Sequence, residues 1–281
     1  MSREGLGMRF QDKVIWVTGA SAGIGEALAV ALHAEGAHLV LSARRADELE
    51  RVKANCTSGS GEVLVVPFDV TDEIGRSAAY GQVISRFGHV DLLINNAGLS
   101  QRSQAKDTQF GVDRRVMEIN YFAPVALTKL VLPDMIKRKS GHIAVTSSVS
   151  GRYGVWNRTA YCGAKHAVHG FFDSLRVEVC GHNIDVTTFI FGAIQTEVSK
   201  NALTGDGTPY GKVDKLVQNG LPLNEVIPKV VDGLAKRARE IVVAEPASLK
   251  YLRLSRYWPS ELFRRQTKRG REQRRELAAA K

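Results

Sequence analysis

A hydroxyl, a phenol and an ammonium group lie within one short stretch of this 281-residue sequence, at Ser148, Tyr161 and Lys165. Tyr161 and Lys165 are four residues apart, so on a helix they share one face. A phenol has a pKa of about 10 in water, and a nearby ammonium favours its ionised form. We therefore expect Lys165 to bring Tyr161 toward useful acid/base strength near neutral pH. Ser148 could hydrogen-bond the substrate oxygen to which Tyr161 would transfer its proton. Taken alone, such a pair is also typical of an exposed helix surface.

A glycine-rich turn earlier in the chain is suited to binding phosphate. Residues 18–25 read TGASAGIG and follow directly on the apolar run at 13–18. A tight turn between a strand and a helix directs backbone N–H groups and the positive end of the helix dipole toward an anion. Glycines let the backbone approach a pyrophosphate closely. The turn therefore predicts a dinucleotide site formed by Gly19, Ser21, Ala22, Gly23, Ile24 and Gly25.

Two arginines follow the second apolar run and indicate which dinucleotide binds. An acidic residue at this point would hold the ribose hydroxyls of NAD, but the sequence has Arg44 and Arg45. A guanidinium pairs with the 2′-phosphate of NADP, so we expect NADP(H) to be preferred over NAD(H). Arg44 is nearer the strand end. The alternative is a pair of solvated arginines before a helix.

The elements that must position these groups alternate between strand-like and helix-like segments. The strands are expected at 13–18, 38–43, 62–68, 90–95, 141–148, 185–191 and 240–245. The helices are expected at 23–36, 46–56, 72–87, 159–181 and 224–239, with two more filling 107–138, the second starting near Asn120. Strands that are apolar on both faces and separated by helices are typical of a covered parallel sheet. The pattern predicts an α/β fold with a single doubly wound (Rossmann) sheet of about seven strands and helices on both faces.

The chain divides into one large domain and a basic tail. Composition is ordinary for a globular protein, with 44% hydrophobic residues, and shows no break up to residue 245. We therefore expect a catalytic domain at 1–245, including a substrate lid at about 193–222, and a tail at 246–281. Between Lys250 and Lys281 there are 11 Lys and Arg against three Glu, so most of the net charge of +10 lies in the tail.

With these features in place, the chain resembles the short-chain dehydrogenase/reductase family over roughly residues 10–245. The resemblance rests on the glycine turn, on NNAG at 95–98, on Asn120 in MEINYF, and on Ser148 followed by YCGAK at 161–165. The stretches LSARRADELERV, SQRS and AYCGAKHAVHGFFDSLR are most similar to one branch, which includes the dehydrogenase/reductase member 7 proteins and hydroxysteroid dehydrogenases.

The resemblance implies roles for further residues. Asn120, Ser148, Tyr161 and Lys165 would be catalytic, with Asn120 holding a water that links Lys165 to solvent, and Tyr161 and Lys165 also touching the cofactor. The other cofactor contacts that it implies are Asp69 and Val70 at the adenine, Asn96, Ala97 and Gly98 after the fourth strand, and Ile194 and Thr196 at the carboxamide. A homodimer or homotetramer is implied as well. The chain departs from the family where Phe191-Gly192 replaces the usual Pro-Gly.

These features predict an NADP(H)-dependent oxidoreductase that transfers hydride between the nicotinamide and a lipophilic carbonyl or secondary alcohol. The lid contributes apolar and aromatic residues, which favour such a substrate: Val198, Leu203, Tyr210, Val213, Leu216 and Val217. No charged cluster in the sequence argues for an acyl-carrier or phosphate-bearing substrate. Two other functions stay open, a non-catalytic cofactor-binding or scaffold protein and a nucleic-acid binder that uses the basic tail. No nucleic-acid motif is recognised in the sequence, which argues against the last of these functions.

The sequence also predicts the cellular location of the protein and the character of its tail. It has no apolar run of the roughly 18 residues that span a bilayer and no signal-peptide pattern, so we expect a cytoplasmic protein. We expect Cys56, Cys162 and Cys180 to be reduced thiols, and the histidines have no metal-site spacing, so no metal is expected. The tail alternates leucine and aromatic residues with basic ones. It is either a solvated, partly helical extension or a peripheral membrane anchor.

Overall fold

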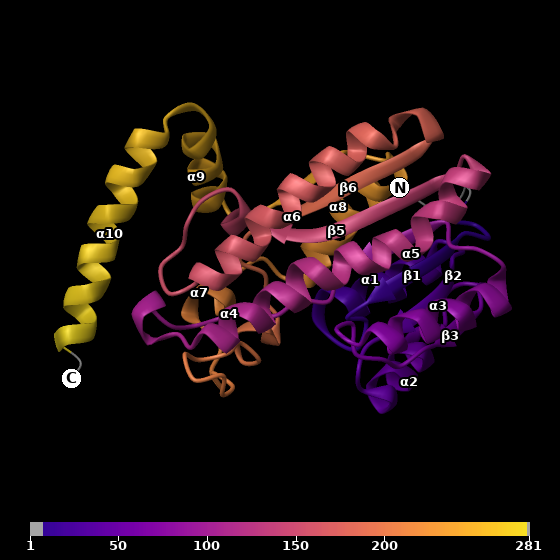
Figure 1. Cartoon of the computed structure of the whole chain (residues 1–281), viewed down its shortest axis with the longest axis horizontal. Helices are drawn as coiled ribbons and strands as arrows, with labels where there is room; N and C mark the ends of the chain where they lie inside the picture. The colour runs from indigo at the N-terminus through magenta and orange to yellow at the C-terminus, as the bar shows by residue number, and fades with distance from the viewer. Residues whose placement is uncertain (1–7, 280–281) are drawn as a thin grey trace.

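Seven strands form a single sheet at the centre of the computed structural model, which describes residues 8–279 (Figure 1). Their order is β3-β2-β1-β4-β5-β6-β7, and all neighbours are parallel. The strands are β1 (Val14–Thr18), β2 (His38–Ser42), β3 (Val63–Val65), β4 (Leu92–Asn95), β5 (Gly141–Ser148), β6 (Ile184–Phe191) and β7 (Glu240–Val243). The predicted doubly wound sheet is confirmed. Residues 1–7 of the predicted domain and residues 280–281 of the tail lie outside the described part of the chain.

Helices cover both faces of this sheet. One face carries α1 (Gly23–Ala34), α2 (Ala46–Asn55) and α8 (Leu223–Ala235). The other carries α3 (Glu73–Phe87), α5 (Ala123–Arg138) and α6 (Thr159–Glu178). Beyond the carboxyl ends of the strands lie α4 (Phe110–Met117), packed on α6, and α7 (Lys215–Gln218) (Figure 1). The crevice at that end of a doubly wound sheet is where ligands bind in such folds.

The first strand shows why the sheet must be covered on both sides. All five residues of β1 are buried. Ile15 and Val17 join the core cluster beneath α1 and α8, whereas Val14 and Trp16 join the cluster beneath α3, α5 and α6. Alternate side chains of a strand point to opposite faces, and each large apolar side chain that is buried stabilises the fold by about 1.5–3 kcal/mol. A strand apolar at every position therefore requires helices on both sides.

The segment at 107–138 differs in detail from the prediction of two separate helices. The helices α4 and α5 run into each other through a π-helical turn at Glu118–Phe122, which contains Asn120. Such turns carry one extra residue and occur often at functional sites. Periodicity alone located the change near Asn120 but not its geometry.

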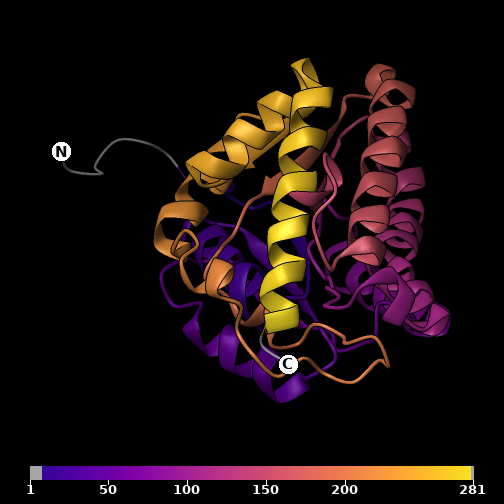
Figure 2. The same cartoon turned by 90° about the vertical axis from the view of Figure 1, so that its left-hand side faces the viewer.

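The tail forms two helices, α9 (Pro246–Tyr257) and α10 (Pro259–Ala279). In Figure 2, where this side faces the viewer, α10 lies in front of the body. Leu262 of α10 is buried in a small cluster with Val149, Tyr153 and Ile190, against which Tyr251 and Leu252 of α9 also pack. Farther along α10, Gln266 donates a hydrogen bond to the Gly154 carbonyl at 2.5 Å. The helices of the tail therefore contact the loop at 153–156, which follows the end of β5.

Candidate active site

The turn between β1 and α1 has a backbone that only glycine fits at two positions. Gly19 and Gly23 have φ values of 66° and 58°, in the left-handed region that side chains disfavour. A Cβ at Gly19 would lie 2.8 Å from the Cα of Ala97, and one at Gly25 would collide with the Gly19 carbonyl oxygen. The turn therefore packs directly against the Asn96–Gly98 segment after β4, as expected for neighbouring strands.

The same turn faces the segment after β6. A Cβ at Gly23 would lie 3.3 Å from the Thr196 Cγ2, so two parts of the predicted cofactor site, 173 positions apart in the sequence, come together. Ile194 is only 4% exposed and packs in the core, and Val70 is buried as well. Any ligand contact by Ile194 or Val70 would consequently involve mainly its backbone.

Each of the two arginines after β2 lies near another predicted cofactor contact. Arg45, the N-cap of α2, donates a hydrogen bond to the Ser21 hydroxyl at 3.4 Å. Arg44 is exposed and acts on Asp69. Burial opposes ionisation of Asp69, but hydrogen bonds from Thr71 and the charges of Arg44 and Arg115 outweigh it and lower the pKa of that carboxyl. An open glycine turn, two guanidinium groups and Asp69 at the neighbouring strand end fit a phosphate-bearing dinucleotide.

A chain of hydrogen bonds joins the glycine turn to Lys165. The Asn96 side-chain amide donates to the carbonyls of Thr18 and Gly19, at 3.2 and 3.3 Å. Its oxygen accepts from the Thr146 hydroxyl at 3.2 Å, and the Thr146 carbonyl accepts from Lys165 Nζ at 2.7 Å. The position of the lysine is thus tied to the turn that would hold the pyrophosphate.

Asn120 fixes the loop after β4 from within the π-helical turn. Its amide nitrogen donates to the carbonyls of Leu99 and Val116, at 2.7 and 2.8 Å, and its oxygen accepts from the Leu99 N–H at 3.3 Å. A Cβ on Gly98 would lie 3.1 Å from Asn120 Oδ1 and 3.9 Å from Lys165 Nζ. Asn120, Gly98 and Lys165 therefore lie next to one another.

Ser148 and Tyr161 form the remaining part of the cluster. The Ser148 hydroxyl lies at the end of β5, donates to the Phe191 carbonyl at 3.1 Å and accepts from the Ser150 N–H at 3.2 Å. The Ser148 hydroxyl also lies close enough to the Tyr161 phenol to favour the ionised form of that phenol. Tyr161 is half-buried in the first turn of α6, and Lys165 Nζ lies 5.6 Å from the centre of its ring. Phe191, which stands where the family usually has proline, keeps β6 paired with both neighbours and provides the carbonyl that Ser148 contacts.

The charges around Tyr161 differ from those expected from the sequence. Burial raises the pKa of Tyr161, and the strongest opposing charge is Arg158 rather than Lys165. Burial also lowers the pKa of Lys165 to about 7, so its ammonium is only partly protonated near neutral pH. Lys165 therefore does not lower the pKa of the Tyr161 phenol in this structure in the way that the sequence predicted.

Arg158 belongs to a charged cluster that the sequence analysis missed. Arg102 Nε and Arg158 Nη2 both contact Asp214 Oδ2, at 2.6 and 3.2 Å. Arg102 comes from the loop after β4, Arg158 is the N-cap of α6, and Asp214 precedes α7 in the lid. These residues are scattered in the sequence. The one available signal was the spacing of Arg158 and Tyr161, which places them on the same face of the first helical turn.

The comparisons with known proteins agree with this architecture. The family model described as short chain dehydrogenase matches residues 13–207, and the chain belongs to that family. It is 42% identical over 270 residues to the mouse (Mus musculus) protein called dehydrogenase/reductase SDR family member 7B, covering 94% of this chain and 83% of the relative. This places it in the member 7 branch, as the wording of its motifs predicted.

Solved structures share the fold. A short-chain dehydrogenase/reductase from Burkholderia phymatum in complex with NAD superposes with a TM-score of 0.75 at 23% identity, covering 88% of this chain and 93% of that one. A metagenomic short-chain oxidoreductase in complex with NADP gives 0.68 at 27% identity, covering 84% and 98%. The fold is thus one that binds nicotinamide cofactors.

Within residues 8–279, no three His, Cys, Asp or Glu side chains are grouped as metal ligands would be. No helix in the described chain has the length and apolarity to cross a membrane.

Proposed function

We propose that this oxidoreductase of the short-chain dehydrogenase family is NADP(H)-dependent and converts a lipophilic ketone or aldehyde and the corresponding alcohol into each other. The observation that carries the proposal is the cluster of Ser148, Tyr161 and Lys165, in which hydrogen bonds through Thr146 and Asn96 join Lys165 to the glycine turn. A proton-transfer group beside a dinucleotide site is what carbonyl reduction requires.

Each residue of the cluster has its own role in the proposed reaction. Bound NADP(H) supplies the hydride or accepts it at its nicotinamide ring. Tyr161 gives its phenolic proton to the carbonyl oxygen during reduction and takes it back during oxidation. Ser148 hydrogen-bonds the same oxygen and stabilises the charge that develops there. Lys165 holds the ribose and resupplies the proton, while Asn120 fixes the Leu99 backbone beside it.

The preference for NADP rests on Arg44 and Arg45. They are the cationic groups at the end of β2, and Arg45 already contacts Ser21 of the glycine turn. A guanidinium forms charge-assisted hydrogen bonds with a phosphate, which stabilise a complex about twice as strongly as neutral ones. Neither arginine forms an ion pair in the described structure that would compete with a 2′-phosphate.

The lipophilic substrate is supported by an apolar cluster beside Tyr161. Leu203 of the lid is buried with Val112, Val116 and Ala164, and the Tyr161 ring and Leu99 pack against them. Of the other apolar lid residues, Val217 is buried, whereas Val198 and Leu216 are 43% and 45% exposed. The apolar surface near the phenol is therefore built by both the lid and α4.

Replacement of Tyr161 by Phe tests the assignment. The ring is kept and the transferable proton is lost, so we expect turnover of aromatic ketones to fall at least about a hundredfold. NADPH binding, measured by nicotinamide fluorescence, should persist. Turnover close to wild type in Tyr161→Phe would show that another group donates the proton.

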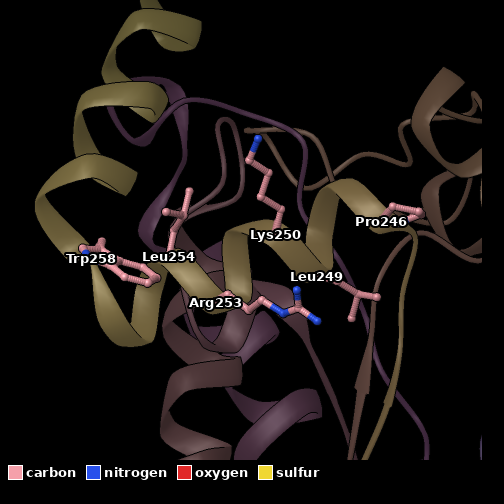
Figure 3. Close-up of a pocket in the computed structure, with 6 residues that line it drawn as sticks. All are labelled: Pro246, Leu249, Lys250, Arg253, Leu254 and Trp258. Atoms are coloured by element: carbon pink, nitrogen blue, oxygen red, sulfur yellow. The ribbon is translucent and has the colours of Figure 1, made fainter.

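We further propose peripheral contact with anionic membranes through the tail. Tyr257, Trp258 and Phe263, at the corner between α9 and α10, are 64%, 62% and 65% exposed. A surface groove of about 480 Å³ beside them is lined by Pro246, Leu249, Leu254, Trp258 and the cationic side chains of Lys250 and Arg253 (Figure 3). Aromatic groups next to cations are typical of interfacial membrane contacts.

Members of this family are generally oligomeric, and we propose a homodimer or homotetramer. We propose a cytoplasmic location, which agrees with three unpaired cysteines in the described chain, Cys56, Cys162 and Cys180.

A further inference from the structure

A pair of arginines shares one carboxylate next to the proposed proton donor. The side chains of Arg102, Arg158 and Asp214 are 7%, 16% and 17% exposed. Two guanidinium groups and one carboxylate leave one positive charge in excess in a region shielded from water. Removing a charge from water is costly unless an opposite charge compensates it.

The donors of Arg158 are only partly used. Within the described chain, Arg158 makes one side-chain hydrogen bond, from Nη2 to Asp214 at 3.2 Å. Arg102, in contrast, donates to Asp214, to the Ser100 hydroxyl and to the Gln101 carbonyl. The guanidinium of Arg158 thus retains donors for a further acceptor. Burial and the charge of Arg102 lower the pKa of Arg158 despite Asp214, which means that the carboxylate does not fully compensate it.

The place of Arg158 in the fold adds to this imbalance. It is the N-cap of the 20-residue helix α6, and its side chain does not cap the helix. The N-terminal end of a helix carries a partial positive charge and favours anions. An arginine there, beside a second arginine, is unfavourable, and the single carboxylate of Asp214 compensates only part of the combined positive charge.

We infer that Arg158, supported by Arg102, binds an oxyanion of the substrate, so that the preferred ketone carries a carboxylate or a phosphate-type group as well as an apolar part. The inference rests on the proposed function, because Arg158 lies three residues before Tyr161 and acts directly on its phenol. Asp214 is the counter-ion that holds the two arginines before substrate binds. The apolar cluster around Leu203 then receives the remainder of the substrate.

Matched pairs of ketones test this assignment. Benzoylformate and its methyl ester share one carbonyl and differ in the negative charge, and acetonylphosphonate and its dimethyl ester do the same for a phosphonate. The ratio of kcat/KM for acid to kcat/KM for ester is measured with NADPH. We expect the ratio to fall at least about tenfold in Arg158→Gln, because a charged hydrogen bond is lost, and to be largely restored in Arg158→Lys. The pair that shows the larger effect identifies the anion.

Two more variants separate an anion site from a simple closure of the lid. Lys212→Gln removes one exposed positive charge from the segment that contains Asp214, and it should leave the ratio of kcat/KM for acid to kcat/KM for ester unchanged. Asp214→Asn removes the counter-ion and should raise the ratio. If the three charged residues only hold the lid, Arg158→Gln and Asp214→Asn lower the rates for acid and ester alike. That result, or an unchanged ratio in Arg158→Gln, would overturn the inference.

A binding measurement tests the anion site at Arg158 without relying on turnover. Benzoate and phenylphosphonate should raise the Tm of the wild-type protein more than neutral benzamide does, and this difference should vanish in Arg158→Gln. If none of the ketones is reduced but the difference in Tm is found, the proposed function is wrong and the anion site stands. If wild type and Arg158→Gln respond equally to both anions, the anion site is refuted whatever the activity.

Discussion

At the scale of single residues, burial determines several charges in this protein. Lys165 is 2% exposed, and burial brings its pKa to about 7. Its ammonium therefore gains most from partners that compensate for lost water, such as the Thr146 carbonyl. Tyr161 experiences the opposite shift, since burial raises the pKa of its phenol. Both shifts favour the neutral forms of Tyr161 and Lys165. A charged ligand bound beside them should therefore change the protonation of both side chains.

His142 offers a test of the same physics away from the site. Its Nε2 lies 2.8 Å from the Thr187 hydroxyl, which itself donates to the Ala238 carbonyl, so the histidine donates in this contact. Burial, and to a lesser extent the charge of Arg237, lower the pKa of His142 from 6.5 to about 3. Between these values the unfolded chain binds more protons than the folded one.

We therefore expect the free energy of unfolding to fall as the pH is lowered from about 6.5 toward 3, and the dependence to be weaker in His142→Gln. Urea unfolding at a series of pH values measures both slopes. Some slope should remain, because the pKa of His169 is likewise lowered by burial, to about 4. Identical slopes in the two proteins would mean that His142 does not titrate as its burial implies.

At the scale of elements, the site is assembled from the ends of strands. The turns after β1, β2, β4, β5 and β6 meet because parallel strands all end at one edge of the sheet. Hydrogen bonds between these turns, such as Asn96 to Gly19 and Arg45 to Ser21, then fix their spacing. Each turn would face a different part of the cofactor, so removal of side chains that reach only the 2′-phosphate should alter recognition of that part.

Replacing Arg44 and Arg45 together by Ala should weaken NADPH binding about tenfold or more and leave NADH binding nearly unchanged. The reason is the loss of charge-assisted contacts of roughly 1.5–3 kcal/mol with the 2′-phosphate. Fluorescence titration with each cofactor gives the two Kd values.

Lys53→Ala provides the matched control, because Lys53 is an exposed cation on α2 that pairs only with Glu50 within the described chain. An equal loss of affinity for NADPH and NADH in the double variant would place the 2′-phosphate elsewhere.

At the scale of the whole molecule, the tail is both part of the packing and a charged surface. Gln266 contacts the 153–156 loop, so deletion of 264–281 would remove packing as well as charge. Arg271, Arg274 and Arg275 are exposed on α10 and suit a milder change.

Changing these three arginines to Gln should weaken co-sedimentation with phosphatidylserine vesicles, because each basic residue near an anionic surface contributes about 1 kcal/mol. Binding by the wild-type protein should decrease as ionic strength rises. Turnover of a water-soluble ketone should not change.

The control removes three exposed positive charges elsewhere, from Lys106, Lys200 and Lys236. Loss of binding to the same extent in both triple variants would indicate a general effect of net charge. If the wild-type protein stays in the supernatant with these vesicles at low salt, the membrane proposal is wrong.

The sheet and the local turns could be predicted from the amino-acid sequence. Apolar strands such as 14–18 specify burial on both faces of the sheet. Gly19 and Gly23 have a left-handed backbone that side chains disfavour, so glycines in this pattern indicate a tight turn. The Tyr161–Lys165 pair follows from helical spacing alone. These features depend on neighbours in the chain, which is why they can be predicted from the chain.

The protonation of the buried groups and the long-range contacts could not be predicted in this way, because they depend on how distant segments pack. Arg102 and Asp214 are 112 positions apart and meet because the loop after β4 and the lid lie at the same edge of the sheet. The contact of Gln266 with Gly154 spans the same separation in sequence. Burial of Tyr161 and Lys165 likewise depends on what several distant segments place around them. The physical reason is that desolvation and Coulomb forces act through space, and the sequence gives no distance between residues that are far apart in it.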